Sequence, residues 1–312
     1  MIISASYKTD IPAFYGDWFM RRIEEGYCKV VNSYNGKAGI VDLSAGAVDG
    51  IVFWTRNPRP FVKSLERLEH LGYPFYVQYT ITGYPETVEP FVPSWQESVD
   101  TLRVLSRMFG KNSVIWRYDP ILISSVTDME FHRDNFSRIA SSLKGFTSDV
   151  VISFVQLYRK TSGKLGALSA GRGIGFHDIS GERKTAFAME LTSMARMNGM
   201  ELALCGQREL LAEGLKDACC IDPFRMAEIA GKPVAVPSGK SHRKNCGCYE
   251  ARDIGAYDTC LHGCAYCYAV SSRERALHNF GNHDPEGEFL VAPCSSGDGM
   301  HAGSVNRQCR LF

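Results

Sequence analysis

Two kinds of hydrophobic pattern alternate along the chain. Six short apolar runs, rich in β-branched and aromatic residues, predict buried strands at residues 1–6, 50–55, 75–82, 113–120, 150–157 and 201–205. Between these runs, apolar residues recur every three or four positions, which predicts amphipathic helices at 60–71, after Ser94, after Thr127 and before Gly199. The capping box from Ser94 to Glu97 marks the start of one of these helices.

The repeated order of strand and helix predicts an α/β fold, in which a parallel sheet carries its helices on the outside. Six or more such units favour a parallel (β/α) barrel, complete or partial, over an open doubly wound sheet. We expect residues 1–230 to form the barrel core. Residues 231–312 lack regular periodicity and are rich in cysteine, proline and glycine, so we expect them to complete the barrel and to end in a tail.

Composition narrows the possible functions. The chain has 312 residues and a formal net charge of +1, so its charge favours neither nucleic acid nor an acidic partner. It begins MIISASYKTD, without a basic segment ahead of a long apolar one, and no apolar run approaches the roughly 20 residues of a membrane helix. We therefore expect a cytoplasmic protein with no membrane partner. In that compartment, eleven cysteines predict metal or redox chemistry rather than disulfide bonds.

Polar residues gather where the predicted strands end, which is where parallel barrels place their active sites. The candidate substrate contacts are Gln78, Arg117, Asp119, Arg56 and Asn57. Asp10, Asn57 and Asp119 each lie within two residues of a following proline, so capping a helix or closing a turn is an equally good interpretation for them. Arginines together with carboxylates suit a small polar substrate, anionic ones included.

The cysteines concentrate late in the chain, and Cys260, Cys264 and Cys267 fall within eight residues. Four cysteines saturate an iron–sulfur cluster, whereas three leave one iron open to a substrate or cofactor. Gly263 lets the backbone bend toward the sulfurs. The alternative is a zinc site completed by His262 or by another cysteine, although the spacing is not the paired spacing of a zinc ribbon.

The segment CLHGCAYCYA resembles the CxxxCxxC signature of radical S-adenosylmethionine enzymes, with Tyr266 as the aromatic residue before the last cysteine. The resemblance implies that Cys260, Cys264 and Cys267 hold a [4Fe-4S] cluster, that its open iron chelates S-adenosylmethionine, and that Tyr266 contacts this cofactor. It implies further that an electron from a reductant such as ferredoxin or flavodoxin generates a 5′-deoxyadenosyl radical, which abstracts hydrogen from the substrate. The alternative class is a non-catalytic iron–sulfur or zinc protein.

The whole chain also resembles a bacterial and archaeal family of uncharacterised radical S-adenosylmethionine-like proteins, a domain of unknown function. The matching segments include IISASYKTDIPAFYGDWF, DGIVFWTRNP, VIWRYDPIL and VISFVQLY, and they are spread over nearly the full length. The family usually has an arginine where this chain has Lys8, which keeps the charge but loses the planar fork of donors.

In the usual barrel of these enzymes the cysteines follow the first strand, whereas here they follow the last. We therefore predict a circularly permuted barrel, in which residues 251–259 supply a strand that packs beside residues 1–6. The loop after residues 1–6 would then reach the amino group of the cofactor. We expect that contact to come from Ser4, Ser6, Thr9 or Asp10.

A second set of cysteines comes from three separate segments and comprises Cys205, Cys220, Cys246 and Cys248. Four thiolates can saturate a cluster or a zinc ion, and they would fasten the loop-rich segment onto the barrel. We expect an auxiliary [4Fe-4S] cluster here, with structural zinc as the alternative.

Overall fold

The computed structural model describes residues 1–32, 35–237, 239 and 245–293. Its centre is an eight-stranded sheet in the order β10–β1–β4–β5–β6–β7–β8–β9, and each pairing is parallel. The strands are β1 (Ile2–Ala5), β4 (Gly50–Thr55), β5 (Phe75–Thr80), β6 (Val114–Ile121), β7 (Asp149–Phe154), β8 (Glu201–Leu204), β9 (Lys216–Asp217) and β10 (Arg252–Asp253). The six strands predicted from the apolar runs are therefore confirmed.

The strand order has no reversal. From β1 to β9 each strand of the main sheet is added on the same side, and β10 lies on the other side of β1. Doubly wound sheets reverse direction at a switch point, whereas barrels add strands in one direction. Within the described residues β9 and β10 remain the two ends of the sheet, so no closed barrel is formed. The α/β class and the large parallel sheet are confirmed.

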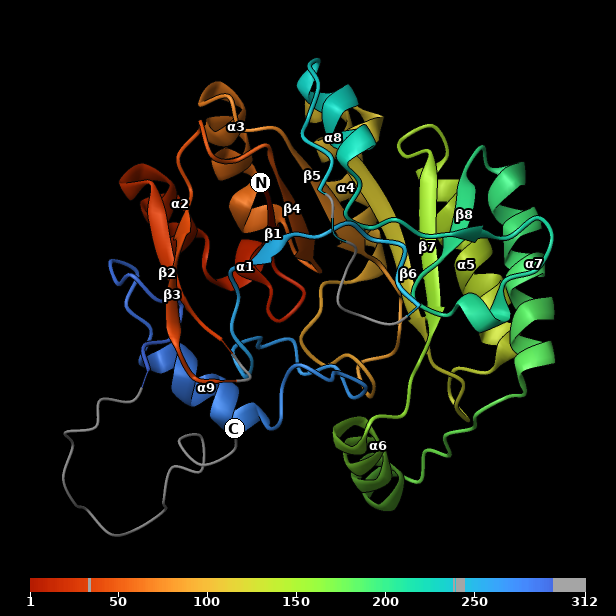
Figure 1. The fold of residues 1–312 in the computed structure, drawn as a ribbon. Coiled ribbons are helices and arrows are strands. Elements are labelled where there is room, and N and C mark those ends of the chain that lie inside the picture. Colours follow the sequence, from red (N-terminus) through yellow and green to blue (C-terminus); the bar gives the residue numbers. More distant parts are fainter. Residues whose placement is uncertain (33–34, 238, 240–244, 294–312) are drawn as a thin grey trace, which may run out of the picture.

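The last strand lies beside the first, as predicted for residues 251–259 (Figure 1). Ile3 pairs with Arg252, and Ser4 pairs with Asp253. Segments about 250 residues apart in sequence therefore meet at one end of the sheet.

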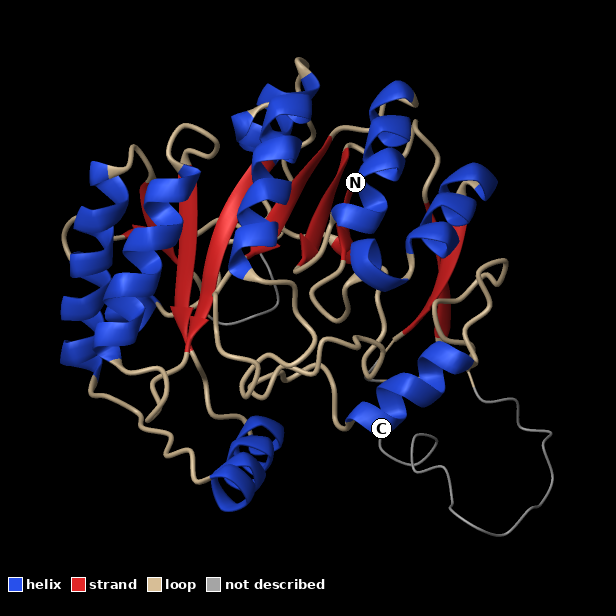
Figure 2. Cartoon of the chain, turned by 180° about the vertical axis from the view of Figure 1, so that it is seen from behind, coloured by secondary structure: helices blue, strands red, loops and turns tan. Residues whose placement is uncertain are grey.

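The main helices cover one face of the sheet, which is the near face in Figure 2. They are α3 (Val62–His70), α4 (Trp95–Phe109), α5 (Met129–Leu143) and α7 (Gly181–Met197). Ser94 caps α4 in the predicted capping box, whereas Asp128, one residue later than predicted, caps α5.

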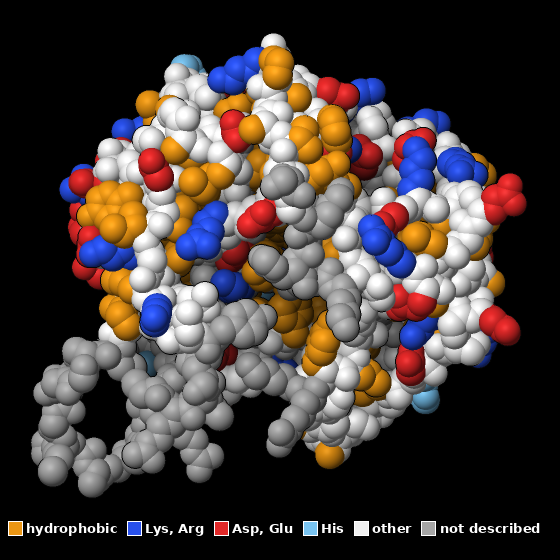
Figure 3. Space-filling view, in the orientation of Figure 1, with side chains coloured by type: hydrophobic (Ala, Val, Ile, Leu, Met, Phe, Trp, Pro, Cys, Tyr) orange, Lys and Arg blue, Asp and Glu red, His pale blue; other side chains and the backbone are white. Residues whose placement is uncertain are grey.

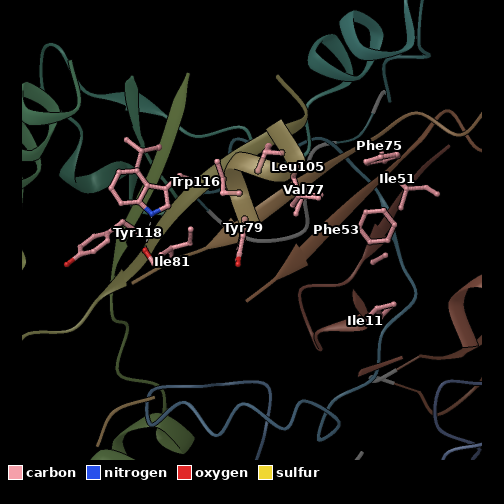
Figure 4. Close-up of a cluster of buried hydrophobic side chains, with 14 of the residues drawn as sticks. Ile11, Ile51, Phe53, Phe75, Val77, Tyr79, Ile81, Leu105, Trp116 and Tyr118 are labelled. Carbon is pink, nitrogen blue, oxygen red and sulfur yellow. Dashed lines mark hydrogen bonds between the residues drawn. The ribbon is translucent and has the colours of Figure 1, made fainter. Parts of the chain in front are cut away.

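The large core lies between these helices and the sheet. Alternate strand residues such as Phe53, Val77 and Trp116 point toward the helices, where Val77 lies near Leu105 of α4 (Figure 4). The continuous apolar runs of the sequence reflect burial of these strands on both faces.

The opposite face of the sheet, here called the inner face, carries a second apolar cluster that includes Ile2, Val52, Tyr76, Ile115 and Val151. Residues between 218 and 251 cover this cluster, among them α8 (Pro223–Ala230). Toward the carboxyl ends of the strands the same face turns polar, with the side chains of Ser4, Gln78, Arg117, Asp119 and Ser153.

Several elements have no counterpart in the prediction. They are the hairpin of β2 (Tyr27–Val31) and β3 (Ala38–Asp42), α6 (Arg159–Arg172), α8 and α9 (Arg273–Gly281). Two short helices, α1 (Ile11–Phe14) and α2 (Gly16–Glu25), follow β1, and the 3₁₀ turns are η1 (Arg59–Phe61), η2 (Lys111–Ser113) and η3 (Arg208–Leu210). Helices α6 and α9 flank the carboxyl edge of the sheet (Figure 1). None of the described helices is both long and apolar enough to cross a membrane.

Candidate functional site

The loop that carries Cys260, Cys264 and Cys267 follows β10 and runs past the carboxyl ends of the strands (Figure 1). Asp258 ties the two ends of this loop together. Its backbone N–H donates to the carbonyl oxygen of Ala269 at 2.9 Å, and its carboxylate accepts from the Ser271 hydroxyl at 2.7 Å. The cysteine loop is therefore a closed structural unit.

The three thiols of this loop interact with one another electrostatically. Burial raises the pKa of Cys264 to about 12, although the Arg56 guanidinium lowers it in part and the Cys267 thiol raises it further. Burial also raises the pKa of Cys260, and Asp10 and the other two thiols add to the increase. Without a bound cation the buried sulfurs of Cys260 and Cys264 are held as thiols.

His262 lies within the same loop, and both of its ring nitrogens have protein partners. Nδ1 lies 3.0 Å from the carbonyl oxygen of Phe91, and Nε2 lies 2.8 Å from the carboxylate of Asp10. Both ring nitrogens are therefore engaged by protein groups in this arrangement. Asp10 also accepts from the backbone N–H of Ala13 at the start of α1, as expected for a capping residue, and from that of Arg56.

Arg56 and Tyr266 meet at Glu89, a residue that the sequence analysis did not identify. Arg56 Nη1 lies 2.8 Å from Glu89 Oε1, and the Thr82 hydroxyl lies 2.8 Å from both oxygens of the carboxylate. The Tyr266 hydroxyl donates to Glu89 and accepts from Arg56. The Glu89 side chain is only 2% exposed. The network that it forms lies next to Cys264 and fixes the position of the Tyr266 ring.

Asp253 connects the residues at the end of β1. Ser4 donates to its carboxylate at 2.7 Å and Ser6 at 2.9 Å, and Lys8 Nζ lies 3.4 Å away. Thr9 is buried beside them, and its hydroxyl oxygen has no hydrogen-bond partner among the residues that the structure describes.

Only glycine fits at position 255 beside this group. A Cβ atom there would lie 2.0 Å from Ser6 Oγ and 3.2 Å from Thr9 Cγ2. The four predicted contacts Ser4, Ser6, Thr9 and Asp10 therefore fall into three different situations. Ser4 and Ser6 are held by Asp253, the Thr9 hydroxyl has no partner within the described part of the chain, and Asp10 binds His262 and caps the start of α1.

Gln78, Arg117 and Asp119 come together on the inner face. Arg117 donates from Nε to Asp119 at 3.1 Å and from Nη1 to Gln78 Oε1 at 3.1 Å. Ser153 donates to the same Asp119 carboxylate, and Gln78 donates to the carbonyl oxygen of Cys220 at 3.0 Å. On this side the molecule is hollowed, with hydrophobic and basic side chains visible in and around the hollow (Figure 3).

Asn57 belongs to neither group. Its backbone N–H donates to Thr55 Oγ1 at 3.0 Å and closes the turn after β4, which was the simpler interpretation of this residue. Asp253 and Glu89 were missed. Asp253 stands at a strand end, so the rule that located the other polar candidates could have found it. Glu89 lies in a loop that gives no such signal.

The second set of cysteines lies on the inner face beside Arg117. Cys205 Sγ and Cys220 Sγ are 3.6 Å apart, and Arg117 Nη1 donates to Cys220 Sγ at 3.0 Å. A hydrogen bond with Cys220 lowers the pKa of Cys248, but a hydrogen bond with Cys246 and burial outweigh it and raise the value to about 12. The four thiols are thus neighbours.

Neither set forms a preformed metal site. Among the described residues, no group of three or more His, Cys, Asp or Glu side chains is placed so that it could hold a metal ion. A pocket of about 550 Å³ lies at the opposite edge of the sheet, between α3, α4 and α8, and contains none of the candidate residues.

Comparison with protein-family models matches residues 2–269 to a family described as a domain of unknown function (DUF1848). The matched range includes both sets of cysteines. The searches of curated proteins and of solved structures give no match.

Proposed function

Because the chain belongs to the DUF1848 family, whose description assigns no activity, we propose from the site itself that the protein is a radical S-adenosylmethionine enzyme that acts on a small polar substrate. The observation that carries the proposal is a closed loop with three neighbouring thiols, beside which the other candidate ligands of the described chain are already engaged by protein groups. Both nitrogens of His262 have protein partners, Asp10 is bound to His262, and Glu89 is bound to Arg56. A cluster held by Cys260, Cys264 and Cys267 would keep one iron open.

The donor set fits a cluster better than a single ion. A zinc ion gathers its ligands around one point, whereas each cysteine on a cubane cluster binds a different iron. Three thiols leave a structural zinc ion one ligand short but leave one iron of a cluster open, and the Cys267 and Cys264 thiols act on Cys260 closely enough to raise its pKa. Arg56 lies close enough to Cys264 to offset part of the negative charge that three thiolates bring.

The strand order supports the finer description of the fold. A sheet without a reversal, with β10 and the cysteine loop next to β1, is the arrangement expected of a circularly permuted partial barrel of the radical S-adenosylmethionine type. In this arrangement residues 1–230 form the core, and the segment that follows completes it.

A bound and reduced cluster, held by Cys260, Cys264 and Cys267, would supply the one electron that cleaves S-adenosylmethionine to methionine and the 5′-deoxyadenosyl radical. The protein's part is to bind and orient. Tyr266, fixed by Glu89 and Arg56, offers its ring to the adenine. The unpaired hydroxyl of Thr9 and the carboxylate of Asp253, with Ser4 and Ser6, are acceptors for the cofactor's amino group.

We assign substrate binding to the polar end of the inner face. Asp119, Ser153 and Gln78 surround Arg117 there, and all four are donors or acceptors suited to a small polar molecule. Arg56 serves the cofactor side through Glu89 and Tyr266, so we assign it to cofactor binding rather than to the substrate. The electron comes from a protein reductant such as ferredoxin or flavodoxin.

The test is an assay for 5′-deoxyadenosine. Protein reconstituted with iron and sulfide without oxygen, then given dithionite and S-adenosylmethionine, should release this product. The Cys264→Ser variant should not, whereas Cys28→Ser, which alters a buried core thiol outside both sets, should retain the activity. Absence of product from the unmutated protein, with zinc bound to the cysteine loop, would favour a non-catalytic metal protein instead.

A further inference from the structure

We propose that Cys205, Cys220, Cys246 and Cys248 bind one zinc ion in a closed tetrahedral site, and that this site fastens the segment between residues 218 and 251 to the inner face of the sheet. The proposal does not depend on the radical chemistry. It assigns a structural role to thiols that the reaction proposed above does not use.

The distance between two of the sulfurs favours a single ion. Zinc–sulfur bonds of about 2.3 Å in a tetrahedron place neighbouring sulfurs about 3.8 Å apart. Cys205 Sγ and Cys220 Sγ are 3.6 Å apart, although they come from different segments of the chain. On a [4Fe-4S] cluster each sulfur extends from a different iron, so the sulfurs lie much farther apart. This distance therefore favours zinc, the second of the two alternatives left by the sequence, over an auxiliary cluster; because the described residues hold no preformed metal group, the other thiols would turn toward the ion on binding.

The remaining thiols adjoin this pair. Cys248 Sγ accepts the backbone N–H of Cys220 at 3.2 Å, and Cys248 interacts with Cys246 as well. Gly247, between them, lies so close to the backbone of residue 218 that a Cβ atom would be 2.6 Å from the Ala218 carbonyl oxygen. The close approach that this glycine permits holds the Cys246–Cys248 turn against the chain that carries Cys220.

The surroundings suit a charged thiolate site. A zinc ion with four thiolates has a net charge of −2, and the Arg117 guanidinium lies against one of the sulfurs, with its Nη1 3.0 Å from Cys220 Sγ. The backbone N–H that points at Cys248 supplies a further hydrogen bond to sulfur. Since Arg117 also binds Asp119 and Gln78, zinc binding would fix the position of the polar group on the inner face.

The experiment measures metal content and coordination in the full-length protein. We expect about one zinc per chain, with an X-ray absorption spectrum of four sulfur ligands at about 2.3 Å. Cys248→Ser and Cys205→Ser should lower the zinc content at least tenfold. Cys264→Ser, in the cysteine loop, and Cys219→Ser, next to the set, should leave it unchanged.

Three results would overturn the proposal. Loss of iron rather than zinc in Cys248→Ser would identify an auxiliary cluster, and equal zinc in Cys248→Ser and Cys264→Ser would show that the ion lies elsewhere. A disulfide between Cys205 and Cys220 in metal-free protein, found by mass spectrometry, would assign the pair to redox chemistry. If the variants do not fold, cobalt substitution in the unmutated protein decides, because tetrahedral thiolate coordination has its own visible absorption bands. The 5′-deoxyadenosine assay is scored separately, so either proposal can fail without the other.

Discussion

Replacing Glu89 by glutamine tests the buried network beside the cysteine loop. Glutamine keeps the shape of the side chain and one acceptor oxygen but removes the charge, so Arg56 loses its ion-pair partner. The two side chains are 2% and 12% exposed, and Arg56 Nη1 lies 2.8 Å from Glu89 Oε1. Removing one partner of a buried ion pair lowers the free energy of unfolding by about 3–5 kcal/mol. Because Arg56 is partly exposed, we expect a loss at the lower end of this range, about 3 kcal/mol.

A matched control exists on the surface. Arg133 donates from Nε to Glu190 at 2.6 Å, with a second contact at 3.1 Å, but these side chains are 40% and 41% exposed. Glu190→Gln should therefore cost less than about 1 kcal/mol. The comparison isolates burial, because residue type and distance are nearly the same in both pairs.

The free energy of unfolding should be measured by urea denaturation for both variants, with equal metal content in each preparation. The double variant Arg56→Gln, Glu89→Gln should recover part of the loss, because it leaves no unpaired buried charge. If Glu89→Gln is no more costly than Glu190→Gln, the network does not provide the rigid support that we assign to it.

Three further predictions concern stability. Burial lowers the pKa of His132 from 6.5 to about 4, so as the pH falls the unfolded state protonates this imidazole before the folded state does. The free energy of unfolding should therefore fall by about 3 kcal/mol between pH 6.5 and 4. The His132→Gln variant should lack this pH dependence when urea denaturation is repeated across the same range. Gly255→Ala should lower stability by about 1–3 kcal/mol through the clash with Ser6, and an unchanged melting temperature would contradict the packing of β10 on β1. Ser94→Ala should cost about 1 kcal/mol by removing the cap of α4, as urea denaturation would measure, whereas Ser94→Asp, which retains a capping oxygen, should cost less.

The sheet was predictable because burial on both faces gives its strands continuous apolar runs. The elements that were missed lack a comparable signal. The hairpin of β2 and β3 is largely half-exposed, and its residues show no clean alternation. Helix α6 contains Gly163, Gly166 and Gly171 and has no apolar side, so no helical period is visible.

The candidate site was predictable where position along a strand carried the information. Arg117, Asp119 and Gln78 were found by their places at strand ends, and the structure brings them together. The separation of the two arginines into different groups of contacts was not predictable, because it depends on Glu89 and Cys220, which reach them from distant loops. Likewise, the spacing of the second cysteine set could not distinguish one ion from a cluster, since that choice depends on the distance between sulfurs.

The pairing of β1 with β10 determines when the sheet can be completed during translation. Ser4 and Asp253 are 249 residues apart, so at roughly 5–20 residues per second β1 waits about 12–50 s on the ribosome for its second neighbour. During that time one edge of the growing sheet is open to mispairing, and its shortness, four residues, limits the exposure. The thiols of the cysteine loop emerge after this edge is covered. The cluster proposed above could therefore be loaded only after this edge is covered, and a message truncated before residue 252 yields a chain with neither β10 nor that loop.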